Sequence, residues 1–120
     1  RIEYDLLADY LHLGHVALLP FKQELVTHCA LPGKVLQYLA CGLPTIATPL
    51  DGLRSMIPAD SGILYANDFY EMVAMAIDLL SNPYQQDRLC SRGIYQMNLH
   101  CNWKTQLQLF EQMIANVQRA

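Results

Sequence analysis

A lysine and a glutamine lie one helical turn apart in LPGKVLQYLACGLPTIATPLDG, residues 31–52. Pro32 suits the start of a helix, so the sequence predicts a helix over residues 34–41. The free N–H groups at such a start carry partial positive charge, and Gly33 lets a ligand approach the backbone closely. Lys34 adds a full positive charge at the same point. These are the components of a diphosphate-binding site.

The glutamine of this segment, Gln37, has an amide that can both donate and accept hydrogen bonds, as contact with a ribose hydroxyl requires. On the predicted helix, one side carries Val35, Leu36, Leu39 and Ala40, and the other carries Lys34, Gln37, Tyr38 and Cys41. The same pattern is expected of a helix that packs one face and exposes the other to water, with no ligand. On periodicity alone, this second interpretation is the better one.

The elements around this helix predict an α/β fold. Continuous apolar runs bounded by proline and glycine are expected to form buried strands over residues 15–21, 45–48 and 63–65. Helices are expected over residues 5–13 and 53–57 as well as 34–41, with a loop over 22–32. This alternation predicts part of a Rossmann-like parallel sheet with crossover helices. Because three strands would leave an exposed edge, we expect preceding strands of the sheet to lie outside this chain.

The second half of the chain is predicted to be helical. Asp68 and Glu71 have the spacing of a capping box at the start of a helix. Gly42 and Pro44 are expected to end the earlier helix over residues 34–41. The expected core-facing stripe of the helix after Asp68 is Phe69, Met72, Val73, Ala76, Ile77 and Leu80. A helix over about 84–97 follows Pro83, and Asn102 can cap the last helix. The apolar stripe of that last helix is Trp103, Leu107, Phe110, Ile114 and Val117, with Trp103 expected to be a packing anchor.

Composition excludes several classes of protein. The 120 residues are 52% hydrophobic with a formal net charge of −3, which indicates one globular domain and no nucleic-acid partner. No apolar run reaches the roughly 18 residues that a membrane-spanning helix needs, although contact with a bilayer surface stays open. The four cysteines form no C-x-x-C pair, so we expect reduced thiols in the cytoplasm and no metal site. The chain begins without Met, and we expect it to belong to a longer protein.

A series of motifs resembles one family over nearly the whole chain. They are VALLPF, PGKVLQYLACGLPTIATP, DGL, SGILYAND, LLSNP and Asn102-Trp103, in this order. Together they resemble the carboxyl-terminal, donor-binding half-domain of GT-B fold glycosyltransferases of group 1. The resemblance implies that residues 1–120 are the C-terminal portion of a nucleotide-sugar donor-binding domain. The N-terminal acceptor domain and the first strands would then lie outside this chain.

The family resemblance also implies roles for individual residues. Lys34 would neutralise the diphosphate, the backbone at Gly33 would donate amides to it, and no metal or other cofactor would be needed. Two glutamates of the large retaining branch are replaced here by Cys29 and Gln37. Gln37 is expected to bind ribose, and its K-x-x-Q-Y setting is similar to that of xanthan-type glucuronosyltransferases. The sugar edge would be met from a loop that carries Thr27, His28 and Cys29, and Tyr38 would flank the site or pack below that loop.

The expected function is transfer from a UDP- or GDP-sugar to a polysaccharide or glycolipid acceptor, at the cytoplasmic side of the cell membrane. The acceptor site and any catalytic base would lie in the N-terminal domain, so this chain alone would be inactive. Two alternatives stay open. One is a nucleotide-sugar 2-epimerase of the same fold. The other is a degenerate domain retained for protein–protein contact, which the two missing glutamates would explain.

Overall fold

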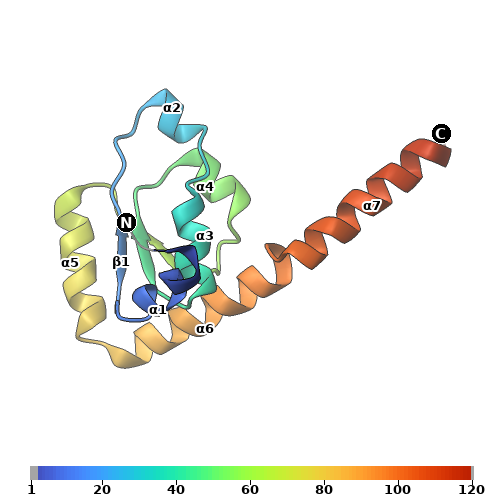
Figure 1. Cartoon of the computed structure of the whole chain (residues 1–120). Coiled ribbons are helices and arrows are strands. Elements are labelled where there is room, and N and C mark those ends of the chain that lie inside the picture. The colour runs from blue at the N-terminus through green and yellow to red at the C-terminus, as the bar shows by residue number, and fades with distance from the viewer. Residues whose placement is uncertain (1–2, 120) are drawn as a thin grey trace.

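A computed structural model describes residues 3–119 and has an α/β fold (Figure 1). Its sheet consists of the parallel strands β1 (Ala17–Leu19), β2 (Thr45–Ala47) and β3 (Ile63–Tyr65), in the order β1-β2-β3. The register aligns Leu18 with Ile46 and Ile46 with Leu64. The predicted parallel sheet is confirmed, although β1 is shorter than the apolar run from which it was predicted.

Helices precede, connect and follow the strands. Before β1 lie the 3₁₀ turn η1 (Tyr4–Leu6) and α1 (Leu7–Leu11). Between the strands lie α2 (Leu25–His28), α3 (Gly33–Ala40) and α4 (Asp51–Met56). After β3 come α5 (Phe69–Leu80), α6 (Pro83–His100) and α7 (Trp103–Arg119). The expected loop over 22–32 is therefore wrong in one respect, because it contains the single turn α2.

Two apolar clusters fix the layers of the fold. On one face of the sheet, residues from the strands pack with α3, α4 and α6, through Leu19, Val35, Leu39, Ala47, Leu50, Leu53, Ile57, Ile63 and Met97. On the other face, Ile46 packs with Ala66 and Met72, which places α5 there. The sheet thus lies between α5 and the layer that carries α3, as a crossover topology requires.

Glycines allow α6 to approach α3 and β3 closely. Gly42 ends α3 with φ of 68°, the left-handed conformation predicted from the sequence. Gly62 has φ of 80°, and a Cβ there would lie 2.3 Å from the carbonyl oxygen of Leu89 in α6. A Cβ on Gly93 of α6 would lie 3.0 Å from the carbonyl oxygen of Leu39 in α3. Backbone therefore packs against backbone here, and α6 is an integral part of the layer that holds α3.

The predicted core-facing stripe of α5 is wrong in most positions. The structure buries Met72 and Leu79, whereas Phe69, Ile77 and Leu80 are exposed. The capping prediction is correct in part, since the Glu71 N–H donates to Asp68 Oδ1 at 2.8 Å. The Glu71 carboxylate accepts from the Asn67 backbone N–H rather than from that of Asp68.

The last helix projects away from the sheet (Figure 1). Asn102 caps it as predicted, because the Thr105 N–H donates to Asn102 Oδ1 at 2.8 Å. Its apolar stripe is not covered by any described residue, and Trp103 is 83% exposed. The expected role of Trp103 as a packing anchor within this chain is therefore wrong. Across residues 3–119, no helix combines the length and the apolar character needed to cross a membrane.

Candidate functional site

The amino end of α3 is open. Pro32 precedes the helix with an extended backbone (φ −66°, ψ 115°), and no side-chain hydrogen bond caps the helix start. The Val35 N–H donates to the Pro32 carbonyl at 3.0 Å, which closes the first turn. A Cβ built on Gly33 would have no atom within 4 Å. Gly33 and Lys34 are exposed and their N–H groups donate to no described residue, so an anion could bind these two amides.

Lys34 extends from this open end into solvent. It is exposed, and it forms no ion pair with any residue of the described part of the chain. On the opposite side of α3, Val35 and Leu39 are buried and hold the helix against the core. Because the chain leaves β1 and returns through α3, this end lies at the carboxyl edge of the parallel sheet (Figure 1). Ligands of open α/β sheets bind at that edge.

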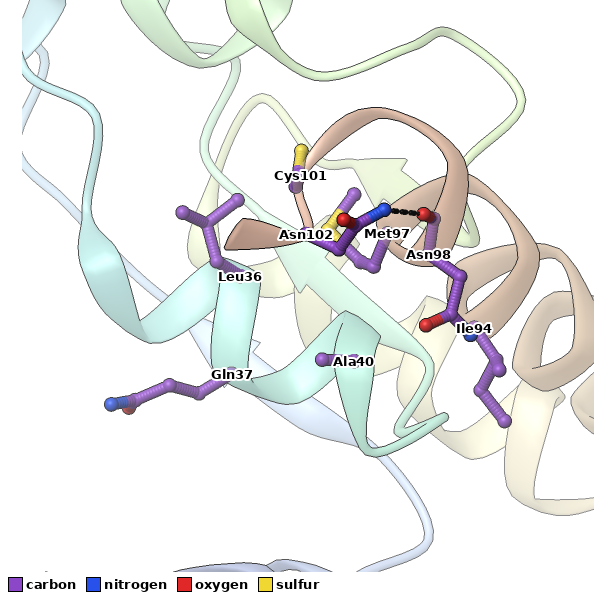
Figure 2. Close-up of a pocket in the computed structure, with 8 residues that line it drawn as sticks. All are labelled: Leu36, Gln37, Ala40, Ile94, Met97, Asn98, Cys101 and Asn102. Atoms are coloured by element: carbon purple, nitrogen blue, oxygen red, sulfur yellow. Dashed lines mark hydrogen bonds between the residues drawn. The ribbon is translucent and has the colours of Figure 1, made fainter. Parts of the chain in front are cut away.

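Gln37 lies one turn further along α3, beside a hollow of about 270 Å³ between α3 and the end of α6. Leu36, Ala40, Ile94 and Met97 give the hollow an apolar lining. Figure 2 shows the amide of Gln37 pointing away from Asn98 and Asn102, which lie on the other side of the hollow and are hydrogen-bonded to each other. The Gln37 amide is thus directed outward, and this hollow is separate from the amino end of α3.

The predicted sugar-facing residues Thr27, His28 and Cys29 have different surroundings. The Thr27 hydroxyl lies 2.5 Å from the Lys22 carbonyl and 2.8 Å from that of Glu24, and it accepts from the Glu24 N–H at 3.0 Å. These bonds build the turn that begins α2, which explains why a helix forms where a loop was expected. Cys29 is exposed and carries a free thiol.

His28 contacts a residue that the sequence analysis did not single out. Its Nδ1 lies 3.0 Å from Asp51 Oδ2 and 3.4 Å from the backbone nitrogen of Asp51, the first residue of α4. At the next position, a Cβ on Gly52 would lie 2.7 Å from the Ala30 carbonyl oxygen and 2.9 Å from that of His28. Nothing in the spacing of 23 residues between His28 and Asp51 predicts this contact.

Tyr38 is partly buried and packs against the core cluster below α3. On α4, the guanidinium of Arg54 lies 4.9 Å from the ring centroid of Tyr65, a cation–π contact. Burial raises the pKa of Tyr65 above 10.0, and the charge of Arg54 opposes that shift. Arg54 therefore contacts the end of β3.

A second hollow, of about 410 Å³, lies directly at the carboxyl ends of the strands. Its lining includes Lys22 and Gln23 after β1, Asn67 after β3, and the apolar side chains of Phe69 and Met72. The Thr48 hydroxyl joins the segment after β2 to the segment after β1, since it accepts from the Phe21 N–H at 3.0 Å and donates to the Phe21 carbonyl at 3.1 Å. Gly33 and Lys34 line neither this hollow nor the one beside Gln37.

The described residues include no group of three His, Cys, Asp or Glu side chains placed to hold a metal ion.

In comparisons with known proteins, the family model described as "Glycosyl transferases group 1" matches residues 1–82. The searches of curated proteins and of solved structures each found no match. The family match spans all three strands and the helices between them, including the open end of α3. Since it covers more than half of the chain, this protein belongs to the group 1 glycosyl transferases.

Proposed function

We propose that this chain is the C-terminal portion of the domain that binds a nucleotide-diphosphate sugar, with UDP or GDP as the nucleotide. The observation that carries the proposal is the open amino end of α3, which no side chain caps, with Lys34 beside it forming no ion pair among residues 3–119. The K-x-x-Q-Y sequence around Gln37 supports a specificity similar to that of xanthan-type glucuronosyltransferases. The acceptor, a saccharide or lipid-linked saccharide at the cytoplasmic face of the membrane, would be bound by an N-terminal domain.

In the proposed reaction, an acceptor hydroxyl oxygen bonds to the anomeric carbon as the bond from that carbon to the diphosphate breaks. The hydroxyl proton goes to a base or to the leaving diphosphate, on which negative charge grows. The amides at the start of α3, their helix dipole and the Lys34 ammonium would stabilise that charge without a metal. Gln37 would bind a ribose hydroxyl through its outward amide. Cys29, which is exposed on the same connection, would lie at the sugar edge.

Ligand binding by the full-length protein tests the proposal. A nucleotide diphosphate that binds only the native state raises the melting temperature, and titration gives its dissociation constant. Lys34→Ala should weaken UDP or GDP binding about 10- to 100-fold, because a charge-assisted contact with phosphate contributes about 1.5–3 kcal/mol. Lys104→Ala is the matched control, since Lys104 is also an exposed lysine but lies on the projecting α7.

Two results would contradict the proposal. Equal nucleotide affinity in Lys34→Ala and Lys104→Ala would remove Lys34 from the site. Failure of the wild-type protein to bind either nucleotide would favour the degenerate domain, for which the exchange of two glutamates by Cys29 and Gln37 is the supporting observation.

A further inference from the structure

The connection between β1 and α3 is held at two points along its length. The first is the turn at Thr27, whose hydroxyl bonds to the backbone of Lys22 and Glu24. The second is the contact between His28 and Asp51, which joins the end of α2 to the start of α4. From His28 the chain takes five residue steps to Gly33, and such a segment spans at most about 18 Å. The second contact therefore restricts where the amino end of α3 can lie.

Close backbone packing supports this contact. A side chain at Gly52 would overlap the carbonyl oxygens of both His28 and Ala30, so the segment lies directly on the first turn of α4. In the tautomer protonated at Nδ1, the His28 ring donates to the Asp51 carboxylate at 3.0 Å. The carboxylate also lies in the first turn of α4, where the helix dipole favours a negative charge.

We propose that His28 and Asp51 are positioning residues, which hold the segment before α3 so that the Gly33 and Lys34 amides stay directed at the diphosphate. This inference rests on the proposed function and changes the role first expected for His28, which was contact with the sugar. Because the Asp51 carboxylate would repel a diphosphate, the pair is not expected to contact that group directly. The pair acts through the backbone of residues 29–32.

The test compares UDP affinity by calorimetry at 15 °C in four variants of the full-length protein. His28→Ala and Asp51→Ala should each raise the dissociation constant about three- to tenfold, because either change releases the segment. The double variant should bind no worse than the weaker-binding single variant, since both substitutions remove the contact between the His28 ring and the Asp51 carboxylate. His28→Asn should stay within about twofold of wild type, because its amide can replace Nδ1–H as donor to Asp51.

Hydrogen exchange of the ligand-free protein gives a second readout that does not depend on nucleotide. The hydrogen-bonded amides of Cys29, Ala30 and Val35 should exchange faster in His28→Ala and Asp51→Ala, while those of β2 should not change. Gly52→Ala should have the same effect with the His28 and Asp51 side chains intact. These measurements separate local release of the segment from a general loss of stability.

Each contrary result has a distinct meaning. Weaker binding in His28→Ala with unchanged or tighter binding in Asp51→Ala would show that His28 contacts the ligand, and would overturn the inference. Unchanged exchange of the Cys29, Ala30 and Val35 amides would also overturn it. If exchange accelerates as expected but Lys34→Ala does not weaken UDP binding, the proposed function fails while the hold of the pair on the segment stands.

Discussion

Replacing Gly33 by alanine should strengthen the fold and weaken the ligand site. The added methyl group would meet no atom within 4 Å, and Gly33 is not among the glycines with positive φ. Alanine also restricts the unfolded chain and favours the helix, so the free energy of unfolding should rise by about 0.5 kcal/mol. A phosphate oxygen bonded to the first amides of α3 lies about 2.9 Å from their nitrogens, so the methyl group would crowd it.

The expected loss of affinity follows from that crowding. Losing one charge-assisted hydrogen bond costs about 1.5–3 kcal/mol, so the dissociation constant for UDP should rise about 10- to 100-fold. Urea unfolding measures the stability of the full-length variant, and calorimetry measures its affinity. Unchanged affinity would show that the diphosphate does not approach this backbone. A fall in stability would show that the space beside Gly33 is not open, and either result refutes the reasoning.

Two further predictions concern the packing of α6 and the reactivity of two cysteines. Gly62→Ala should lower the free energy of unfolding, measured by urea titration, by about 3 kcal/mol or more, because the new methyl group would overlap the Leu89 carbonyl and the φ of residue 62 is positive. A loss below about 1 kcal/mol would contradict the close packing of α6. Iodoacetamide at pH 8 should modify the exposed Cys29 faster than Cys101, because burial raises the pKa of Cys101 and lowers its thiolate fraction. Mass spectrometry of the two peptides measures the modification rates, and equal rates would refute this order.

Local signals explain why the fold could be predicted from the sequence. Pro32 and Gly42 mark the two ends of α3 by backbone conformation, which depends on neighbouring residues only. Short continuous apolar runs likewise indicate strands covered on both faces. The stripes of α5 and α7 could not be assigned in the same way. Periodicity identifies an apolar face, but whether Phe69 or Trp103 is covered depends on which other elements lie against it.

The candidate site was predictable to a similar extent. The open end around Gly33 and Lys34 follows from residues that are adjacent in sequence. The hydrogen bonds of Thr27 compete with any ligand for its hydroxyl, and they depend on a turn that composition did not indicate. The contact between His28 and Asp51 joins two segments whose proximity arises only when β1 and β2 pair.

The projecting helix α7 gives the protein a built-in optical reporter. Trp103 is the only tryptophan in the sequence, and it lies in water at the first turn of α7. Indole emission shifts to shorter wavelength when the ring leaves water, and within these 120 residues no second tryptophan contributes a background signal. Fluorescence of the unlabelled protein would therefore reveal directly when another surface covers this helix, and titration of that signal would measure how tightly it does so.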